Sequence, residues 1–173
     1  MLVSIGKRRQ SPELLELLGE CHGRIRQFTA LARDVGQRPE LSAADVTDVC
    51  TRVRRYFVEA LPLHVQDEES SILPRLRGRS DELDQRLTAM LAEHREHEPL
   101  LAHLLLACAE LLEAPADARR RLELGQVADA LAHAFETHLV AEESTIFPAL
   151  NALLTETERA SIVAELRARR QSA

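Results

Sequence analysis

Apolar residues recur along most of this chain at intervals of three and four, the spacing that places side chains on one face of an α-helix. The first such stretch runs from Ser11 and Pro12 to the turn residues between Gly36 and Pro39. We predict a helix with Ser11 as its cap and Pro12 in its first turn. Its apolar face reads Leu14, Leu18, His22, Ile25, Phe28 and Ala32.

Capping residues and prolines delimit three more long helices. Ser42 opens a second helix, which should stop near Pro74 because proline cannot continue an α-helix. Ser80 caps a third helix, which Pro115 closes, and a fourth runs from about residue 118 to 148. Pro99 lies inside the third, so we expect a bend or π-bulge near residues 95–99.

These patterns predict an all-α protein built as an up-down-up-down four-helix bundle. The sequence Thr155-Glu156-Thr157-Glu158 has a capping-box pattern and begins a short fifth helix. We expect one domain over residues 1–173, with the bundle at about 11–150 and the short C-terminal helix at about 155–170.

The second and fourth helices carry the same motif. Residues 64–74 and 138–148 both read His-x-x-x-Glu-Glu-Ser, then Ser or Thr, Ile, an apolar residue and Pro. The repeat extends upstream at steps of 4, 4, 3, 4 and 4, through Val53, Phe57, Leu61, His64, Glu68 and Ile72 and through Val127, Leu131, Phe135, His138, Glu142 and Ile146. Each His and Glu therefore falls on the apolar face of its helix.

Buried histidine and carboxylate groups are costly unless they are paired or bind a metal. A single such motif is more often an ordinary helix pair, but two matched copies favour a metal site. His22 precedes His64 by 42 residues, and His94 precedes His138 by 44. Each half of the chain thus offers one His on its first helix and His-x-x-x-Glu on its second.

Imidazole and carboxylate donors suit first-row metals. We predict a two-metal site with His22, His64, His94 and His138 as terminal ligands and Glu68 and Glu142 as bridges. Six protein ligands leave open positions for a small diatomic molecule or peroxide. Mixed N/O donors with open positions favour iron, although zinc and manganese stay open at this point.

The same residues resemble the hemerythrin-like, or HHE cation-binding, family over about residues 11–150. The resemblance rests on His22, His64-x-x-x-Glu68-Glu69 before Ile-Leu-Pro, Glu93-His94, and His138-x-x-x-Glu142-Glu143 before Ile-Phe-Pro. It implies a carboxylate-bridged di-iron centre held by the six ligands named above. Oxygen-carrying hemerythrins have His-x-x-x-His on the third helix and His-x-x-x-x-Asp on the fourth. Glu98 and Glu143 occupy those last positions here, so reversible oxygen carriage is in doubt.

Several neighbours are alternative or supporting groups. His97 lies one turn from His94 and could replace or supplement it, but its spacing to His138 fits the family less well. Glu98 is an extra ligand or a hydrogen-bond partner of a ligand. The expected roles of the others are as follows: Glu69 and Glu143 face solvent or support ligands, His103 and His133 lie on the surface, Tyr56 has no catalytic role, and Cys21, Cys50 and Cys108 are reduced thiols.

Composition narrows the class further. Lys and Arg total 22 against 28 Asp and Glu, a net charge of −6, which argues against binding to nucleic acid or anionic membranes. No apolar stretch reaches the roughly 20 residues of a membrane span. We expect a cytoplasmic protein whose protein partner, if any, the sequence does not indicate.

Three functional classes follow from this sequence. The first is a non-haem di-iron protein that binds, senses or reacts with a small oxidant such as O2, NO or peroxide. The second is a di-iron oxidase or a peroxide-decomposing enzyme. The third is a metal-free helical interaction module, in which the matched His and Glu residues would be a costly coincidence.

Overall fold

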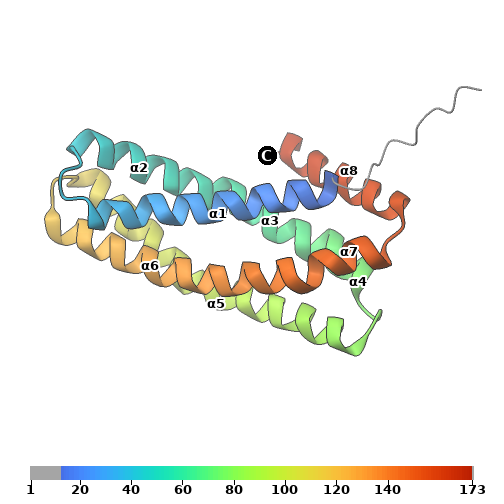
Figure 1. The fold of residues 1–173 in the computed structure, drawn as a ribbon. Helices are drawn as coiled ribbons and strands as arrows, with labels where there is room; N and C mark the ends of the chain where they lie inside the picture. The colour runs from blue at the N-terminus through green and yellow to red at the C-terminus, as the bar shows by residue number, and fades with distance from the viewer. Residues whose placement is uncertain (1–12, 173) are drawn as a thin grey trace, which may run out of the picture.

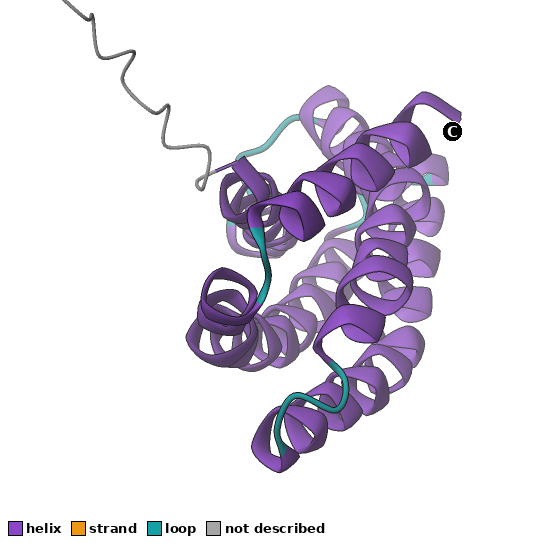
Figure 2. Cartoon of the chain, turned by 90° about the vertical axis from the view of Figure 1, so that its right-hand side faces the viewer, coloured by secondary structure: helices purple, strands orange, loops and turns teal. Residues whose placement is uncertain are grey.

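The computed structural model describes residues 13–172, and these form five continuous helices. The first is α1 (Glu13–Gln37). The second joins α2 (Ala43–Arg55), η1 (Tyr56–Ala60), α3 (Leu61–Asp67), η2 (Glu68–Ile72) and α4 (Leu73–Leu76), where η denotes a π-helical turn. The third is α5 (Asp81–Glu113), the fourth joins α6 (Ala118–Ala141), η3 (Glu142–Ile146) and α7 (Phe147–Leu153), and the fifth is α8 (Glu156–Ser172). No strand occurs among the described residues (Figure 2).

The first four continuous helices form the predicted all-α bundle (Figure 1). Helix α1 packs against α6 and α2, and α5 packs against the same two helices. Short loops make chain neighbours antiparallel, which is the up-down-up-down order. Helix α8 packs against α1, α3 and η2 at one end of the bundle. None of the described helices is both long and apolar enough to cross a membrane.

The predicted helix starts at Ser42, Ser80 and Thr155 are confirmed. Ser42 and Asp45 form a reciprocal capping box, in which the Asp45 N–H donates to Ser42 Oγ at 3.1 Å. The Leu83 N–H donates to Ser80 Oγ, and the Glu158 N–H donates to Thr155 Oγ1, both at 3.2 Å. The predicted start at Ser11 and Pro12 lies outside the described residues.

The second helix ends at Leu76, near Pro74 as predicted, although the proline itself lies inside the helix. The predicted end of the fourth helix at Pro148 was wrong, because this helix continues to Leu153. A π-helical turn closes just before each proline; in η2, for example, the Leu73 N–H donates to the Glu68 carbonyl. The wider turn relieves the clash between the proline ring and the preceding turn, so the helix continues.

The third helix has no π-bulge at residues 95–99, because α5 is α-helical throughout Asp81–Glu113. Pro99 is exposed, and so is Arg95, whose carbonyl loses its usual N–H partner four residues later. Water can satisfy that carbonyl, and the expected bend near these residues stays a prediction.

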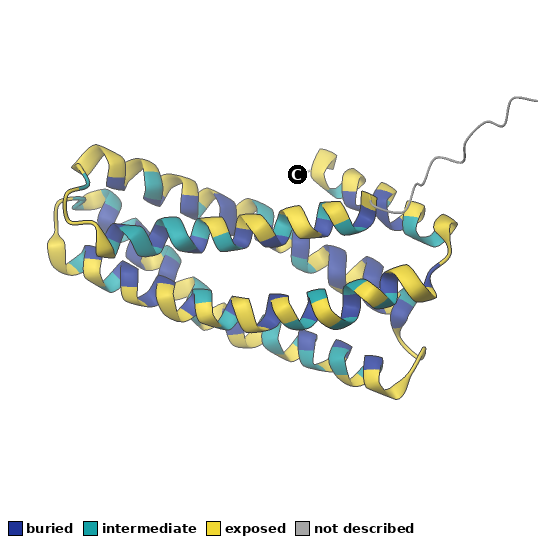
Figure 3. Cartoon of the chain, viewed as in Figure 1, coloured by how far each residue is buried: buried dark blue, intermediate teal, exposed yellow. Residues whose placement is uncertain are grey.

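The buried interior consists of two apolar clusters with polar residues between them. Figure 3 shows buried and exposed residues alternating along the helices of the bundle. One cluster includes Ile25, Leu61 and Phe135, and the other includes Leu18, Ile72 and Ile146. Helix α8 adds Ile162, Val163 and Leu166 to the second cluster. On α1, His22 lies between Leu18 and Ile25, and therefore at the boundary of the two clusters.

Helices α1 and α6 approach closely at two glycines. A Cβ atom on Gly36 would lie 2.8 Å from the Gly125 Cα and 2.9 Å from the Arg121 carbonyl oxygen. Both contacts are to backbone, which cannot move aside as a flexible side chain would. Glycine at these positions therefore fixes the distance between the two helices.

Candidate metal site

The six predicted ligands meet at the boundary between the two apolar clusters. They come from six elements: His22 from α1, His64 from α3, Glu68 from η2, His94 from α5, His138 from α6 and Glu142 from η3. Five of the six residues are buried, and the side chain of His94 is only 7% exposed. Within residues 13–172 they form two groups able to hold a metal ion, and both groups contain Glu68 and Glu142.

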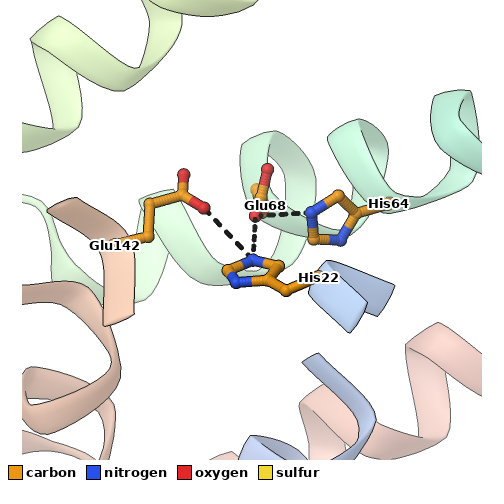
Figure 4. Close-up of side chains that lie close together, drawn as sticks. All are labelled: His22, His64, Glu68 and Glu142. Atoms are coloured by element: carbon orange, nitrogen blue, oxygen red, sulfur yellow. Dashed lines mark ion pairs between the residues drawn. The ribbon is translucent and has the colours of Figure 1, made fainter. Parts of the chain in front are cut away.

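The first group adds His22 and His64 to the two glutamates (Figure 4). His64 Nε2 lies 3.1 Å from Glu68 Oε1, and His22 Nε2 lies 4.0 Å from the same oxygen. His22 Nε2 is also 3.3 Å from Glu142 Oε2. One oxygen of each glutamate therefore faces this pair of histidines.

The second group adds His94 and His138 to the same glutamates. His94 Nε2 lies 3.2 Å from Glu68 Oε2, and His138 Nε2 lies 3.2 Å from Glu142 Oε1. Each carboxylate thus offers one oxygen to each histidine pair. That arrangement suits a carboxylate that bridges two neighbouring ions.

Helix periodicity alone accounts for the two His–Glu contacts that lie within one helix. Both His-x-x-x-Glu pairs are four residues apart, so each Glu lies one turn beyond its His on the same helix face. Glu68 and Glu142 are also the first residues of η2 and η3. Such π-helical turns are often found at functional sites.

Many of the polar atoms in the site are buried without a hydrogen-bond partner. They are His22 Nε2, His64 Nε2, His94 Nε2, Glu68 Oε2 and both carboxylate oxygens of Glu142. Each lies close to an opposing atom yet lacks the geometry of a hydrogen bond. An unsatisfied buried polar group costs about 1–3 kcal/mol, so a convergent set of them fits a site made for a cation.

Carboxylates contact the Nδ1 atoms of three of the four imidazoles, on the side away from the two groups. His22 Nδ1 lies 2.9 Å from Glu143 Oε1, His94 Nδ1 lies 2.8 Å from Glu69 Oε1, and His138 Nδ1 lies 2.6 Å from Glu93 Oε2. Such partners fix the tautomer of a metal-binding imidazole and raise its basicity. Glu69 and Glu143 are therefore partners of predicted ligands.

Arginines support two of these carboxylates. Arg26 Nη1 donates to Glu143 Oε1 at 2.8 Å, and Arg26 also pairs with Glu136. Arg86 Nη1 donates to Glu93 Oε1 at 2.8 Å. Sequence reasoning missed these supports. Arg26, one turn after His22, could have been found from its spacing, whereas Glu93 serves a histidine on another helix.

The pKa values of the six residues shift in different directions in the metal-free site. Burial lowers the pKa of His22 and of His94, but nearby carboxylates outweigh it and raise both to about 9. Burial and the charge of Glu68 raise the pKa of Glu142 to about 8. The histidines hold the pKa of Glu68 well below its usual range despite its burial. Burial lowers the pKa of His64 and of His138.

The alternative ligands lie outside both groups. His97 is buried, with its ring centroid 4.9 Å from Phe135 and 5.2 Å from His138. Glu98 is exposed, and so are His103 and His133, as predicted.

Tyr56 and the cysteines take no part in the candidate ligand groups either. The Tyr56 hydroxyl donates to the Cys21 carbonyl oxygen at 3.4 Å, and the Tyr56 ring stacks on Phe28. Cys21 Sγ lies 3.8 Å from Arg170 Nη2. Cys50 and Cys108 are buried free thiols.

Comparison with known proteins gives one match. The family model of the hemerythrin HHE cation-binding domain matches residues 13–150, which include all six residues of the two groups. A search of curated proteins found no match.

Proposed function

The chain belongs to the hemerythrin HHE cation-binding family, and on that basis we propose that it binds two iron ions and uses them to bind, sense or react with O2, NO or peroxide. One observation carries this proposal. Each of two buried glutamates directs one oxygen to His22 and His64 and the other to His94 and His138. Two ions that share both carboxylates fit this donor set.

The donor set supports iron in particular. Each group offers two imidazole nitrogens and two carboxylate oxygens, a mixture typical of non-haem iron sites. Four donors also leave positions unused in a six-coordinate ion. Bound iron would supply redox chemistry and those open positions. The absence of a thiolate from either group makes a structural zinc site of the cysteine-rich type a poor fit.

The chain itself contributes orientation, protons and exclusion of water. Glu143, Glu69 and Glu93 fix three of the imidazoles through their Nδ1 atoms. The apolar clusters on either side keep bulk water from the site except along the cavity that reaches His64, His94 and His138. Protons held on His22, His94 and Glu142 must leave when cations bind, because a metal ligand is deprotonated.

Metal analysis of two variants tests the assignment. Protein purified without affinity metal or chelator, from cells grown in sufficient iron, should contain about two irons per chain. Glu142→Gln should lose much of this metal because it removes a shared anionic donor. Glu98→Gln is the matched control, since Glu98 is exposed and outside both groups, and it should retain two irons.

Each result has a clear meaning. Near-zero metal that persists after anaerobic iron reconstitution would overturn the proposal and leave a metal-free helical module. Stoichiometric zinc or manganese would keep the site and overturn the redox chemistry. With iron in place, addition of NO or peroxide should change the visible absorption of the wild type but not of metal-depleted Glu142→Gln.

An oxidase or peroxide-decomposing enzyme is a second candidate. A cavity that reaches His64, His94 and His138 favours it, because a turnover enzyme needs an entry path to the site. Peroxide consumption that is equal in wild type and in Glu142→Gln would exclude this alternative.

A further inference from the structure

A cavity of about 340 Å³ lies beside the candidate metal site, between α3 and α5. Its inner end is formed by buried imidazoles, among them His64 and His138. Leu61, Leu101 and Phe135 line its sides. Exposed residues lie at its mouth, so the cavity connects the site with solvent.

The cavity is much larger than the small oxidants considered above need. A water molecule takes up about 30 Å³ of liquid, and a diatomic ligand is of the same order. Pockets that bind small organic molecules begin at about 300 Å³. The size therefore fits an organic molecule in addition to a diatomic one.

Charge differs between the two ends of the cavity. Two divalent ions would exceed the charge of Glu68 and Glu142 by two. The three carboxylates on the imidazoles, offset by Arg26 and Arg86, would reduce this excess to one, so the histidine end would stay positive and attract an anionic group. The exposed part of the lining carries the carboxylates of Glu98 and of Glu69, which reaches His94 Nδ1, against the single guanidinium of Arg95. A second anionic group at the mouth would meet these carboxylates.

We propose that this cavity binds a small monocarboxylate, with the carboxylate at the histidine end and an uncharged hydrocarbon tail between Leu61, Leu101 and Phe135. The proposal rests on the proposed function, because the positive inner end requires bound metal. It adds a ligand class that a site for diatomic molecules alone would not need. The apolar walls hold the tail by burial, and the charge at the mouth selects against dicarboxylates.

Binding of matched probes tests the proposal. Hexanoate, adipate and hexylamine would each be titrated into protein whose metal content has been measured, with heat and chemical-shift changes as readouts. We expect hexanoate to bind at least about tenfold more tightly than adipate, a difference of about 1.4 kcal/mol, and hexylamine not to bind. Metal-free protein should bind hexanoate more weakly than metal-loaded protein.

Two variants on α5 locate the binding site. Leu101→Glu places a carboxylate on the half-buried cavity wall and should abolish hexanoate binding while the metal content stays unchanged. Leu106→Glu is the matched control because Leu106 is 57% exposed and does not line the cavity. It should bind hexanoate as the wild type does.

The outcomes separate the two proposals. Metal-loaded protein that binds adipate as well as hexanoate, or that does not bind hexanoate at all, would overturn the cavity assignment and leave the proposed function intact. Unchanged binding in metal-loaded Leu101→Glu would do the same. A chain that holds no metal would overturn both proposals, because the inner end would then lack its positive charge.

Discussion

Metal binding at neutral pH should release protons from the site. His22 and His94 have a pKa raised to about 9, and Glu142 has a pKa raised to about 8, so all three are protonated in the metal-free protein at pH 7. The pKa shifts of His64, His138 and Glu68 are downward, so these groups hold few protons there. Metal ligands must be deprotonated, so the bound protons leave.

The number of protons follows from these pKa values. At pH 7, a group with a pKa of about 9 is roughly 99% protonated and one with a pKa of about 8 is roughly 90% protonated. Filling both metal positions should therefore release about three protons per chain at pH 7. At pH 9 the same groups hold about one proton in total, so the release should fall to about one.

Anaerobic titration of metal-free protein with ferrous iron measures this release. Calorimetry in buffers of different ionisation enthalpy, or a pH indicator in weak buffer, counts the protons. Glu142→Gln removes one titrating group and a carboxylate that raises the pKa of His22, so it should release at least about one fewer proton per chain filled. His133→Gln changes an exposed histidine outside the site and should leave the number unchanged. Release of less than one proton at pH 7, or a release that does not vary with pH, would refute the charge assignment.

Three further predictions concern stability. Metal-free protein should lose stability from pH 7 to pH 9, because the folded state binds protons on His22 and His94 that an unfolded histidine has already lost. In urea unfolding we expect the free energy of unfolding to fall by roughly 1 kcal/mol or more per pH unit. A flat profile would contradict this prediction. Gly36→Ala should destabilise the protein by about 1–3 kcal/mol through contact with the backbone of α6. Gly19→Ala has open space around it and should stabilise the protein by about 0.5–1 kcal/mol. Equal melting temperatures of the two variants would contradict the close approach of the helices. Arg169→Gln should lower the free energy of unfolding by about 1–3 kcal/mol, because Arg169 Nη1 contacts the fully buried Asp67 carboxylate at 2.6 Å. In an Asp67→Asn background this loss should shrink, and a double-mutant cycle measures the difference.

The bundle and the meeting of the six residues were predictable because both follow from helix periodicity. His64 and Glu68 share a helix face by their spacing alone, and the repeat at His138 and Glu142 supplied the second pair. Of His94 and His97, only His94 joins one of the two groups, and its choice as the ligand stays a prediction. That choice rested on its spacing to His138.

Other features depend on tertiary contacts that spacing does not encode. Pro74 and Pro148 follow π-helical turns while Pro99 lies in a continuous α-helix, a difference that the residue spacing does not predict. Glu93 neighbours His94 in sequence but contacts His138 on α6. The cavity depends on how α3 and α5 pack against each other, which residue spacing does not predict.

The contacts in the two halves of the site are approximately symmetric. His22 corresponds to His94, with Nε2 distances of 3.3 and 3.2 Å to Glu142 and Glu68, and their partners Glu143 and Glu69 correspond as well. Each ion would take both histidines from one half but one carboxylate from each, so a single helical hairpin could complete such a site only as a homodimer.

The symmetry fails at two places. The counterpart of Arg26 is Glu98, and the counterpart of Glu93 is Cys21, so His64 Nδ1 has no carboxylate partner and no hydrogen bond. The His94 and His138 position therefore has two carboxylates on its imidazoles, one of them paired with Arg86, whereas the His22 and His64 position has only one, which is paired with Arg26. Two metal ions bound here would be electronically inequivalent, and the position of His94 and His138 would favour the higher oxidation state.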